Sequence, residues 1–201
     1  GSGFIDFDGD NLIVLSSRGV LGYTNDLESD LSFTQIENNI NEYISLKQFL
    51  KNNSFSLKDL LISNGNIFVS YSEEIDEDCW NTSVIMGKIS YEQINFKKLF
   101  SPGECVHTFK NKDREFHPHP AGGRMVSFDN DHIILTTGPY RSRFLAQDKN
   151  SINGKLIKIN FTNSNYEIIS MGHRNPQGLY YDIENNFLLE TEHGPQGGDE
   201  I

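Results

Sequence analysis

The amino-acid sequence predicts an all-β fold, and the spacing of its strands predicts a β-propeller. Four times along the chain, a tight polar turn rich in Asn, Asp and Gly leads into a short apolar strand. Turns of this composition are hairpin signals. The four strands begin at Leu12, Ile67, Ile133 and Phe187, so the intervals between them are 55, 66 and 54 residues. A repeat near this length, built from short strands, is typical of a propeller with one four-stranded blade per repeat.

Further strands are expected between these repeats, at residues 82–90, 124–128 and 155–161. Only residues 42–50 have a helical pattern, and that stretch is short. A β-sandwich is the competing all-β fold. It predicts turn signals every 8–12 residues or so, but no self-similarity at the longer interval. The recurrence therefore favours the propeller.

The number of repeats corresponds to three blades and the opening of a fourth. We expect blades at about residues 4–55, 56–115 and 116–171, with the start of the fourth at 172–201. Propellers close with about four to eight blades. We therefore expect the chain to be part of a longer protein, or half of a ring completed by a second copy. Such a homodimer would cover the edge strand at residues 187–191.

The charge balance excludes one large class of partners. The 201 residues carry a formal net charge of −11, and an acidic surface repels phosphate backbones, so nucleic-acid binding is not expected. No apolar run reaches the length of a membrane span. No signal peptide is present, but the first three residues, Gly1 to Gly3, have the pattern of an expression scar. The missing leader therefore says nothing about the compartment.

The two cysteines, Cys79 and Cys105, both lie in polar, turn-rich surroundings. Two cysteines alone cannot form a structural zinc site. From the residues alone, either a disulfide that closes one loop of medium length or two free thiols would fit.

Chemistry-bearing residues first gather in residues 116–124, a segment that contains His117, His119 and a glycine pair ahead of Arg124. Histidine is the side chain best suited to accept a proton near neutral pH. Connections into the innermost strands of a propeller face its central channel, where ligands bind. The alternative is a loop braced by prolines, with histidines on its surface.

Two glycine-rich segments near the end of the sequence carry further polar chemistry. In residues 172–178, Arg174 offers a planar fork for a carboxylate or for quinone oxygens, and Asn175 adds a donor and an acceptor. The alternative role for Arg174 is to tie blades together through backbone carbonyls. In residues 192–200, exposed carbonyls and the carboxylates of Asp199 and Glu200 form a ligand set suited to calcium. There the alternative is a solvated acidic loop.

These three segments, with residues 146–148 and 154–159 between them, resemble a known family. They are similar to the soluble glucose and aldose sugar dehydrogenases that use pyrroloquinoline quinone (PQQ), which include sorbosone-dehydrogenase-like proteins. The resemblance covers roughly residues 116–201 and rests on Gly-His-Arg-Asn-Pro-Gln-Gly, Glu-x-Gly-Pro and Asp-Glu-Ile. The first hundred residues or so match only loosely. The family fold is a six-bladed propeller, which implies that about three and a half blades are present.

The resemblance implies oxidation of an aldose sugar at its anomeric carbon, with an external electron acceptor. In that family a histidine removes the hydroxyl proton while hydride passes to PQQ, and His119 falls at its position. Arg174 and Asn175 fall on positions that hold the quinone. The remaining matched positions are calcium ligands: the carbonyls of Gly194 and Pro195 for the ion that bridges to PQQ, and Glu200 for a second ion.

Three departures from the family pattern leave an alternative function open. The spacing from His119 to the glycine pair is the longer of the family's two forms, so His117 stays a candidate base. Leu57 or Lys58 stands where the family has a glutamine that touches the quinone. The later blades, which supply further basic residues, lie outside this sequence. A non-catalytic propeller that binds a carbohydrate or a protein is therefore the alternative.

The resemblance also bears on the compartment. The family is secreted or periplasmic, where disulfides persist. It therefore implies a periplasmic or secreted location for this chain and a bond between Cys79 and Cys105.

Overall fold

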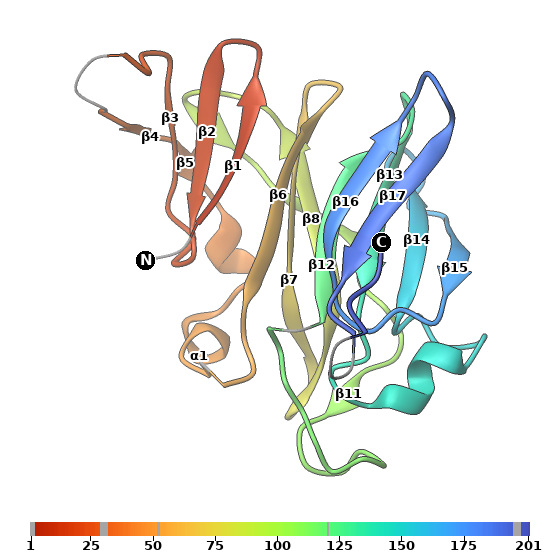
Figure 1. Ribbon diagram of the computed structural model, residues 1–201. Coiled ribbons are helices and arrows are strands. Elements are labelled where there is room, and N and C mark those ends of the chain that lie inside the picture. The colour runs from red at the N-terminus through yellow and green to blue at the C-terminus, as the bar shows by residue number, and fades with distance from the viewer. Residues whose placement is uncertain (1–2, 29–31, 52, 120, 195–197) are drawn as a thin grey trace.

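The computed structural model describes residues 3–28, 32–51, 53–119, 121–194 and 198–201. Within these residues the chain forms a row of antiparallel sheets that stand side by side like the blades of a propeller (Figure 1). The first sheet is formed by β1 (Gly3–Asp8), β2 (Asn11–Ser16), β3 (Leu21–Thr24) and β4 (Thr34–Gln35), in that order.

The second sheet has the order β6 (Leu57–Ser63), β7 (Asn66–Asp76), β8 (Cys79–Lys88) and β10 (Lys97–Phe100), and β11 (Val106–His107) also pairs with β8. The third is formed by β12 (Gly122–Ser127), β13 (His132–Thr137), β14 (Lys155–Asn160) and β15 (Tyr166–Met171). Two further strands, β16 (Pro176–Asp182) and β17 (Phe187–Glu192), pair as the fourth sheet.

The first strands of successive sheets are neighbours, because β1 contacts β6, β6 contacts β12, and β12 contacts β16. These strands are therefore the innermost ones, as in a propeller. The expected strand at each repeat is confirmed, and each is the second strand of its sheet: β2, β7, β13 and β17. A short parallel pair, β5 (Glu37–Asn38) with β9 (Gln93–Ile94), connects the linker after the first sheet to the second sheet.

The helical expectation at residues 42–50 is only partly met. The region holds a 3-10 turn, η1 (Ile40–Glu42), and one short helix, α1 (Leu46–Phe49). The hydroxyl of Ser45 accepts a hydrogen bond from the backbone N–H of Gln48, so α1 begins at this cap rather than earlier. A second 3-10 helix, η2 (Arg143–Gln147), lies in a region where the sequence pattern gave no helix.

The core lies between the sheets. One buried apolar cluster, which includes Ile13, Leu60 and Ile85, fills the space between the first and second sheets. Another, which includes Phe68, Met125 and Ile157, fills the space between the second and third. The second sheet is therefore covered on both faces, which explains the long buried runs in β7 and β8.

An ion pair with a buried carboxylate and a partly exposed arginine links the innermost strands of three sheets. Asp59 on β6 accepts hydrogen bonds from Nη1 of Arg124 (2.9 Å) and the backbone N–H of Met125 (2.8 Å), both on β12. Nε of Arg124 donates to the carbonyl of Gln177 on β16 at 2.9 Å. Burial raises the pKa of Asp59, although these bonds and the arginine charge oppose the shift. The pair fixes the order and spacing of neighbouring blades.

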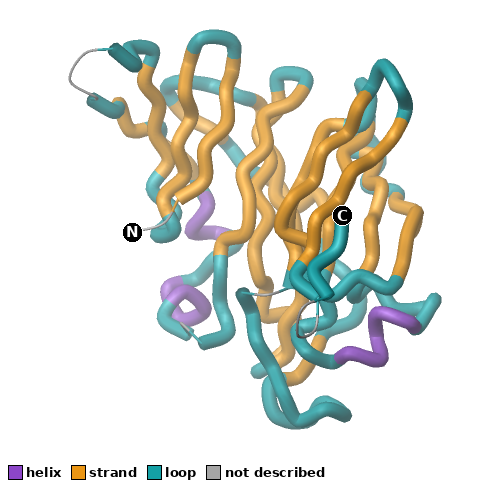
Figure 2. The backbone as a smooth tube through the Cα atoms, in the orientation of Figure 1, coloured by secondary structure: helices purple, strands orange, loops and turns teal. Residues whose placement is uncertain are grey.

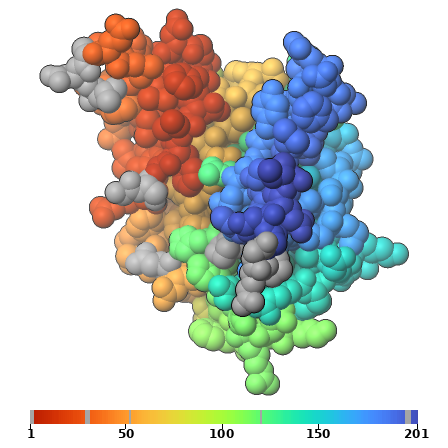
Figure 3. Space-filling model, viewed as in Figure 1, coloured from red at the N-terminus to blue at the C-terminus, as the bar shows by residue number. Residues whose placement is uncertain are grey.

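The molecule has two distinct ends (Figure 2). At the hairpin end, tight turns join the first two strands of each sheet, at residues 9–10, 64–65, 128–131 and 183–186. At the loop end lie the longer connections: residues 108–121, 138–154, 172–175 and the residues that follow β17. In Figure 3 the segment that precedes β12, drawn in green, protrudes at the loop end.

Cys79 and Cys105 form a disulfide at the loop end, with their Cα atoms 5.3 Å apart. Cys79 begins β8, and Cys105 immediately precedes β11, which pairs with the start of β8. The predicted pairing is therefore confirmed. The bond attaches the segment before the histidine loop to the second sheet.

Candidate active site

The histidine loop, residues 116–119, is anchored to the segment that follows β13. The ring of Phe116 stacks on that of Tyr140, with centroids 5.3 Å apart and planes 17° from parallel. Tyr140 is fully buried, and its hydroxyl is hydrogen bonded to the Thr82 hydroxyl at 2.8 Å. The backbone N–H of His117 donates to the carbonyl of Tyr140 at 3.3 Å. This part of the loop end is therefore held by buried aromatic packing.

The two histidines of this loop lie close together, with ring centroids 5.6 Å apart. The side chain of His119 is exposed, whereas that of His117 is half-buried, and its Nδ1 has no hydrogen-bond partner among the described residues. Partial loss of water around the ring, followed by the charges of Lys58 and His117, lowers the pKa of His119. Burial, Arg141 and Lys58 lower the pKa of His117. Both rings are therefore neutral near pH 7, the state in which histidine can accept a proton.

Lys58 is an unexpected component of this site. Its side chain is only 6% exposed, and Nζ donates to the carbonyl of Pro118, between the two histidines, at 2.7 Å. Nζ also lies 5.2 Å from the centre of the Tyr140 ring. The lysine stem passes over Gly123, where an added Cβ would lie 2.4 Å from its carbons. Glycine at 123 is therefore what gives Lys58 room to reach the loop.

A second buried lysine, Lys155 at the start of β14, shows what is unusual about Lys58. Nζ of Lys155 donates to three carbonyls, those of Leu145, Ala146 and Asn153, at 2.8–3.0 Å. Nζ of Lys58 has one carbonyl partner among the hydrogen bonds of the described residues. Burial lowers the pKa of Lys58 to about 7. Its ammonium group is therefore a weakly held proton donor beside both histidines.

Arg174 and Asn175 lie in the short connection from β15 to β16. Nη1 of Arg174 donates to the carbonyls of His193 (2.8 Å) and Gly194. The backbone N–H groups of Arg174 and Asn175 donate to the carboxylate of Glu192. These bonds join the connection before β16 to the segment after β17. Arg174 thus shows the carbonyl-binding role that the sequence left as its alternative, and it does so within the fourth sheet.

Asn175 connects this segment to the histidine loop. Its side chain is buried, and Oδ1 accepts hydrogen bonds from the backbone N–H of Gly122 (3.4 Å) and from Nε2 of Gln177 (2.8 Å). Gly122 follows His119 by three residues. The structure therefore brings the two segments that carry the predicted base and the predicted quinone contacts to one place at the loop end.

Residues 138–143 separate the histidine loop from the connection that carries Arg174 and Asn175. The sequence analysis did not identify this segment as part of the site. Arg141 and Arg143 line a pocket of about 240 Å³ together with Arg174 and Asn175. A larger open pocket of about 790 Å³ lies on the other side of Arg141, lined in part by Arg114 and Phe116. The sequence signal that could have indicated this segment is Pro-Tyr-Arg-Ser-Arg, shortly after a strand. This pattern has no periodicity or spacing that distinguishes a binding site from an ordinary loop.

The predicted calcium ligands lie in the segment after β17. Pro195 falls outside the described residues. The backbone N–H of Gly194 donates to the Asp199 carboxylate at 3.0 Å, and Glu200 forms an isolated bridge with Glu192. A side chain at Gly194 would collide with the Gly198 carbonyl oxygen. The carbonyl of Gly194 and the carboxylates of Asp199 and Glu200 are hard oxygen donors of the kind that calcium accepts, so these residues fit this ion.

A second set of candidate metal ligands lies beside it. One ligand atom each from His173, Glu190 and Glu192 fall within 4.8 Å of one another. Burial, followed by the charges of Glu192 and Glu200, raises the pKa of Glu190 to about 7. Glu192 already accepts the N–H groups of residues 174 and 175. One of the three candidate ligands, the Glu192 carboxylate, is therefore already engaged in hydrogen bonds with the backbone.

Adjacent propeller blades, with histidine, arginine and lysine side chains gathered at one end, define a β-propeller protein with one strongly polar end. The chain belongs to the glucose/sorbosone dehydrogenase family, because the model of that family matches residues 56–201. Over 148 residues, it is 30% identical to the aldose sugar dehydrogenase YliI of Escherichia coli K12. That alignment covers 67% of this chain and 38% of the relative.

Solved structures show the same fold. The PQQ-bound form of an aldose sugar dehydrogenase from Streptomyces coelicolor superposes with a TM-score of 0.70 at 18% identity, over 99% of this chain and 57% of that one. The apo form of the soluble aldose sugar dehydrogenase from Escherichia coli gives 0.66 at 22% identity, over 98% and 58%. The propeller prediction and the family resemblance are thus confirmed. The chain spans well under two thirds of each of these relatives.

None of the helices among the described residues is long and apolar enough to cross a membrane.

Proposed function

We propose that the whole protein is a PQQ- and calcium-dependent dehydrogenase that oxidises an aldose sugar at its anomeric carbon. One observation carries the proposal: the hydrogen bond from Gly122 to the Asn175 side chain brings the histidine loop beside the Arg174–Asn175 turn. Membership of the sugar dehydrogenase family supports the reaction class.

In this proposal His119 is the general base. Its lowered pKa keeps the ring neutral at physiological pH, and its exposure leaves the ring open to an incoming sugar. The anomeric hydroxyl gives its proton to a ring nitrogen of His119 as the carbon is oxidised to the lactone level. His117 is less suited to this role, because its ring is half-buried and its N–H anchors the loop to Tyr140.

PQQ, when bound, supplies the two-electron oxidant by accepting the hydride from the anomeric carbon. Arg174 and Asn175 would hold it, because the guanidinium group of Arg174 suits a cofactor that carries carboxylate groups. Gly194, Pro195 and Glu200 would provide calcium ligands. Because Arg174 donates to the carbonyl of Gly194, a calcium ion at that oxygen would compete with the guanidinium group.

The other features of the proposal concern the surroundings of the enzyme. The Cys79–Cys105 disulfide supports a periplasmic or secreted location, since disulfides persist in oxidising compartments. The partners would be an aldose and an external electron acceptor. Completion of the ring by a second copy stays a prediction, and sedimentation of the 201-residue chain tests it.

A non-catalytic propeller that binds a carbohydrate or a protein is the second candidate. Lys58 favours it, because this residue stands near the position of the quinone-contacting glutamine and is committed to the Pro118 carbonyl. Its ammonium group also adds positive charge beside the proposed base.

The test uses the whole protein, loaded with PQQ and calcium. We expect quinone absorbance that stays with the protein through gel filtration, and dye reduction on addition of aldoses that a calcium chelator abolishes. Retention of sugar binding in calorimetry, without bound quinone or dye reduction, would instead establish the non-catalytic propeller.

A further inference from the structure

The small pocket at the loop end has an unusual composition. It has a volume of about 240 Å³ and is lined by Pro139, Arg141, Arg143, Arg174, Asn175 and His193. Three of the six arginines of a chain with a net charge of −11 therefore meet around one cavity. Its lining includes no carboxylate. Such a concentration of guanidinium groups in an acidic protein indicates an anionic ligand.

The backbone is strained where it presents these side chains. Tyr140 and Arg141 are consecutive non-glycine residues with φ angles of 50° and 72°, a left-handed conformation that costs about 1–3 kcal/mol for each residue. The buried Tyr140 ring, stacked on Phe116, holds this conformation in place. Arg143 is fixed separately, because its backbone N–H donates to the Asp113 carboxylate at 2.8 Å. The backbone thus directs both arginines to the pocket without using their guanidinium groups.

The charges of the two arginines are only partly balanced. Nη1 of Arg141 and Nη2 of Arg143 share a single oxygen of Glu115, at 3.4 Å and 3.0 Å. Their side chains are 47% and 61% exposed, so these ion pairs are weak. Each guanidinium has five N–H donors. Most of the donors are therefore available to a ligand.

The pocket lies between the two groups of the proposed active site. Tyr140, next to Arg141, accepts the hydrogen bond that anchors His117, while Arg174 and Asn175 form the opposite wall of the cavity. Arg141 lies close enough to His117 for its charge to lower the pKa of that ring, so a molecule bound to Arg141 would lie beside the histidine loop.

We propose that Arg141 and Arg143 bind the carboxylate of an acidic sugar, so that the substrate class of this protein is a uronic acid or an oligosaccharide that contains one. In such a sugar the carbon that carries the carboxylate and the anomeric carbon are both bonded to the ring oxygen. Arginines that hold the carboxylate therefore fix the position of the anomeric carbon, two ring bonds away, relative to His119. This inference rests on the proposed dehydrogenase function. A carboxylate of PQQ is the second source of the same chemistry, and the experiment separates the two.

The test compares glucuronate and galacturonate with glucose and galactose as substrates of the loaded whole protein. In Arg141→Gln and Arg143→Gln, we expect KM for the uronates to rise about tenfold or more, the usual loss for one charged hydrogen bond. KM for the neutral sugars should change by less than about twofold, because they do not use that bond. Arg114→Gln is the matched control, because Arg114 is an exposed arginine at the same end that does not line this pocket.

Binding measurements keep the outcomes distinct. Titration of the apo protein with PQQ should give the same Kd in the wild type and both variants. Weaker PQQ binding with an unchanged ratio of uronate to neutral-sugar KM would assign the arginines to the cofactor and overturn the proposal. The proposal also fails if neither quantity changes. If the wild type binds no PQQ, the dehydrogenase function fails. Calorimetry with glucuronate at low and high salt then decides whether the pocket still binds a carboxylate.

Discussion

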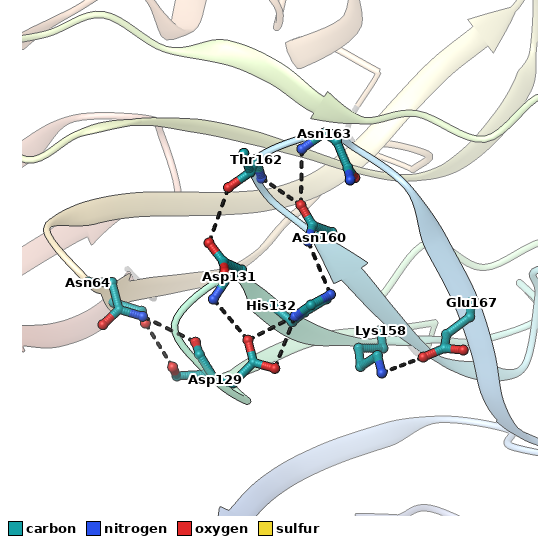
Figure 4. Close-up of polar contacts among 11 residues, drawn as sticks. Asn64, Asp129, Asp131, His132, Lys158, Asn160, Thr162, Asn163 and Glu167 are labelled. Carbon is teal, nitrogen blue, oxygen red and sulfur yellow. Dashed lines mark hydrogen bonds and ion pairs between the residues drawn. The ribbon is translucent and has the colours of Figure 1, made fainter.

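The hairpin end and the loop end of the propeller differ in how completely their polar side chains are hydrogen bonded. At the hairpin end, Asp129 accepts hydrogen bonds from the backbone N–H of Asp131 (2.8 Å) and from the His132 ring (Figure 4). Asn160 contacts the other nitrogen of that ring at 3.2 Å. Asp131 and His132 are local partners of Asp129, and Asn160 reaches the His132 ring from the end of the next strand. These bonds complete the turn.

At the loop end the partners come from distant parts of the sequence and are fewer. Lys58 reaches a carbonyl 60 residues away, and two arginines share one carboxylate. Nδ1 of His117 is buried with no partner among the described residues. Polar groups that are incompletely satisfied in this way are costly unless a ligand uses them. The contrast indicates that the hairpin end serves stability and the loop end serves binding and chemistry.

The strongest test of the contrast replaces one histidine at each end. His119→Ala should lower turnover of the loaded whole protein by about 10²–10⁴-fold, the usual contribution of a positioned base. His132→Ala, at the hairpin end, should leave turnover unchanged. Steady-state dye reduction measures both. A loss in His117→Ala with none in His119→Ala would move the role of base to the neighbouring residue.

The next largest effect concerns the disulfide that fastens the loop end. Cys79→Ser with Cys105→Ser should lower the free energy of unfolding by about 3 kcal/mol, because the chain-entropy model assigns roughly this value to such a loop. The bond joins residues 26 apart in sequence. Urea unfolding measures the change, and reduction of the wild type should reproduce it. Equal midpoints for the oxidised wild type and the double variant would contradict the prediction.

Lys58 should give the loop end a characteristic pH dependence of stability. Its pKa is about 7 in the folded protein and near the ordinary lysine value of 10.5 when unfolded. Between these values the unfolded chain binds one more proton, so wild-type stability should rise with pH by up to about 1.4 kcal/mol per unit. Below about pH 7 this contribution is constant, with the buried charge at its full cost.

Lys58→Met removes this titration, and Lys88→Met, an exposed lysine at the hairpin end, is the control. The difference in unfolding free energy between wild type and Lys58→Met should change across pH 7–10. The Lys88 variant should run parallel to the wild type. Urea midpoints taken at four pH values are sufficient, and parallel curves for the Lys58 variant would show that this ammonium group is not destabilised.

The smallest effect is expected at the hairpin end. Burial alone would raise the pKa of Asp129, but the hydrogen bonds from Asp131 and His132 outweigh it and lower this pKa. The carboxylate therefore stabilises the fold above its usual pKa, and this contribution is lost as the pH falls below it. Asp129→Ala should cost about 1 kcal/mol near pH 7, less near pH 3, and leave turnover unchanged. A drop in turnover would mean that the two ends are coupled.

The contrast also explains how far the sequence could be interpreted. The strands after the turns at Gly9 and Gly65 could be predicted, because Asn, Asp and Gly specify a hairpin within a few residues. The family segments could be recognised because His119 and Arg174 belong to contiguous motifs. Lys58 could not be assigned a role, since its environment depends on Gly123, which lies on another blade. The arginine pocket was missed for the same reason, because three separate loops form it.

The ion pair between Asp59 and Arg124 has a consequence for the order of events during synthesis. At about 5–20 residues per second, the 65 residues between them take roughly 3–13 s to emerge. Until β12 arrives, Asp59 lacks the guanidinium group and the Met125 amide that balance its burial. We therefore expect the carboxylate of Asp59 to stay hydrated until the third sheet docks, and a translational pause before residue 124 to prolong that state.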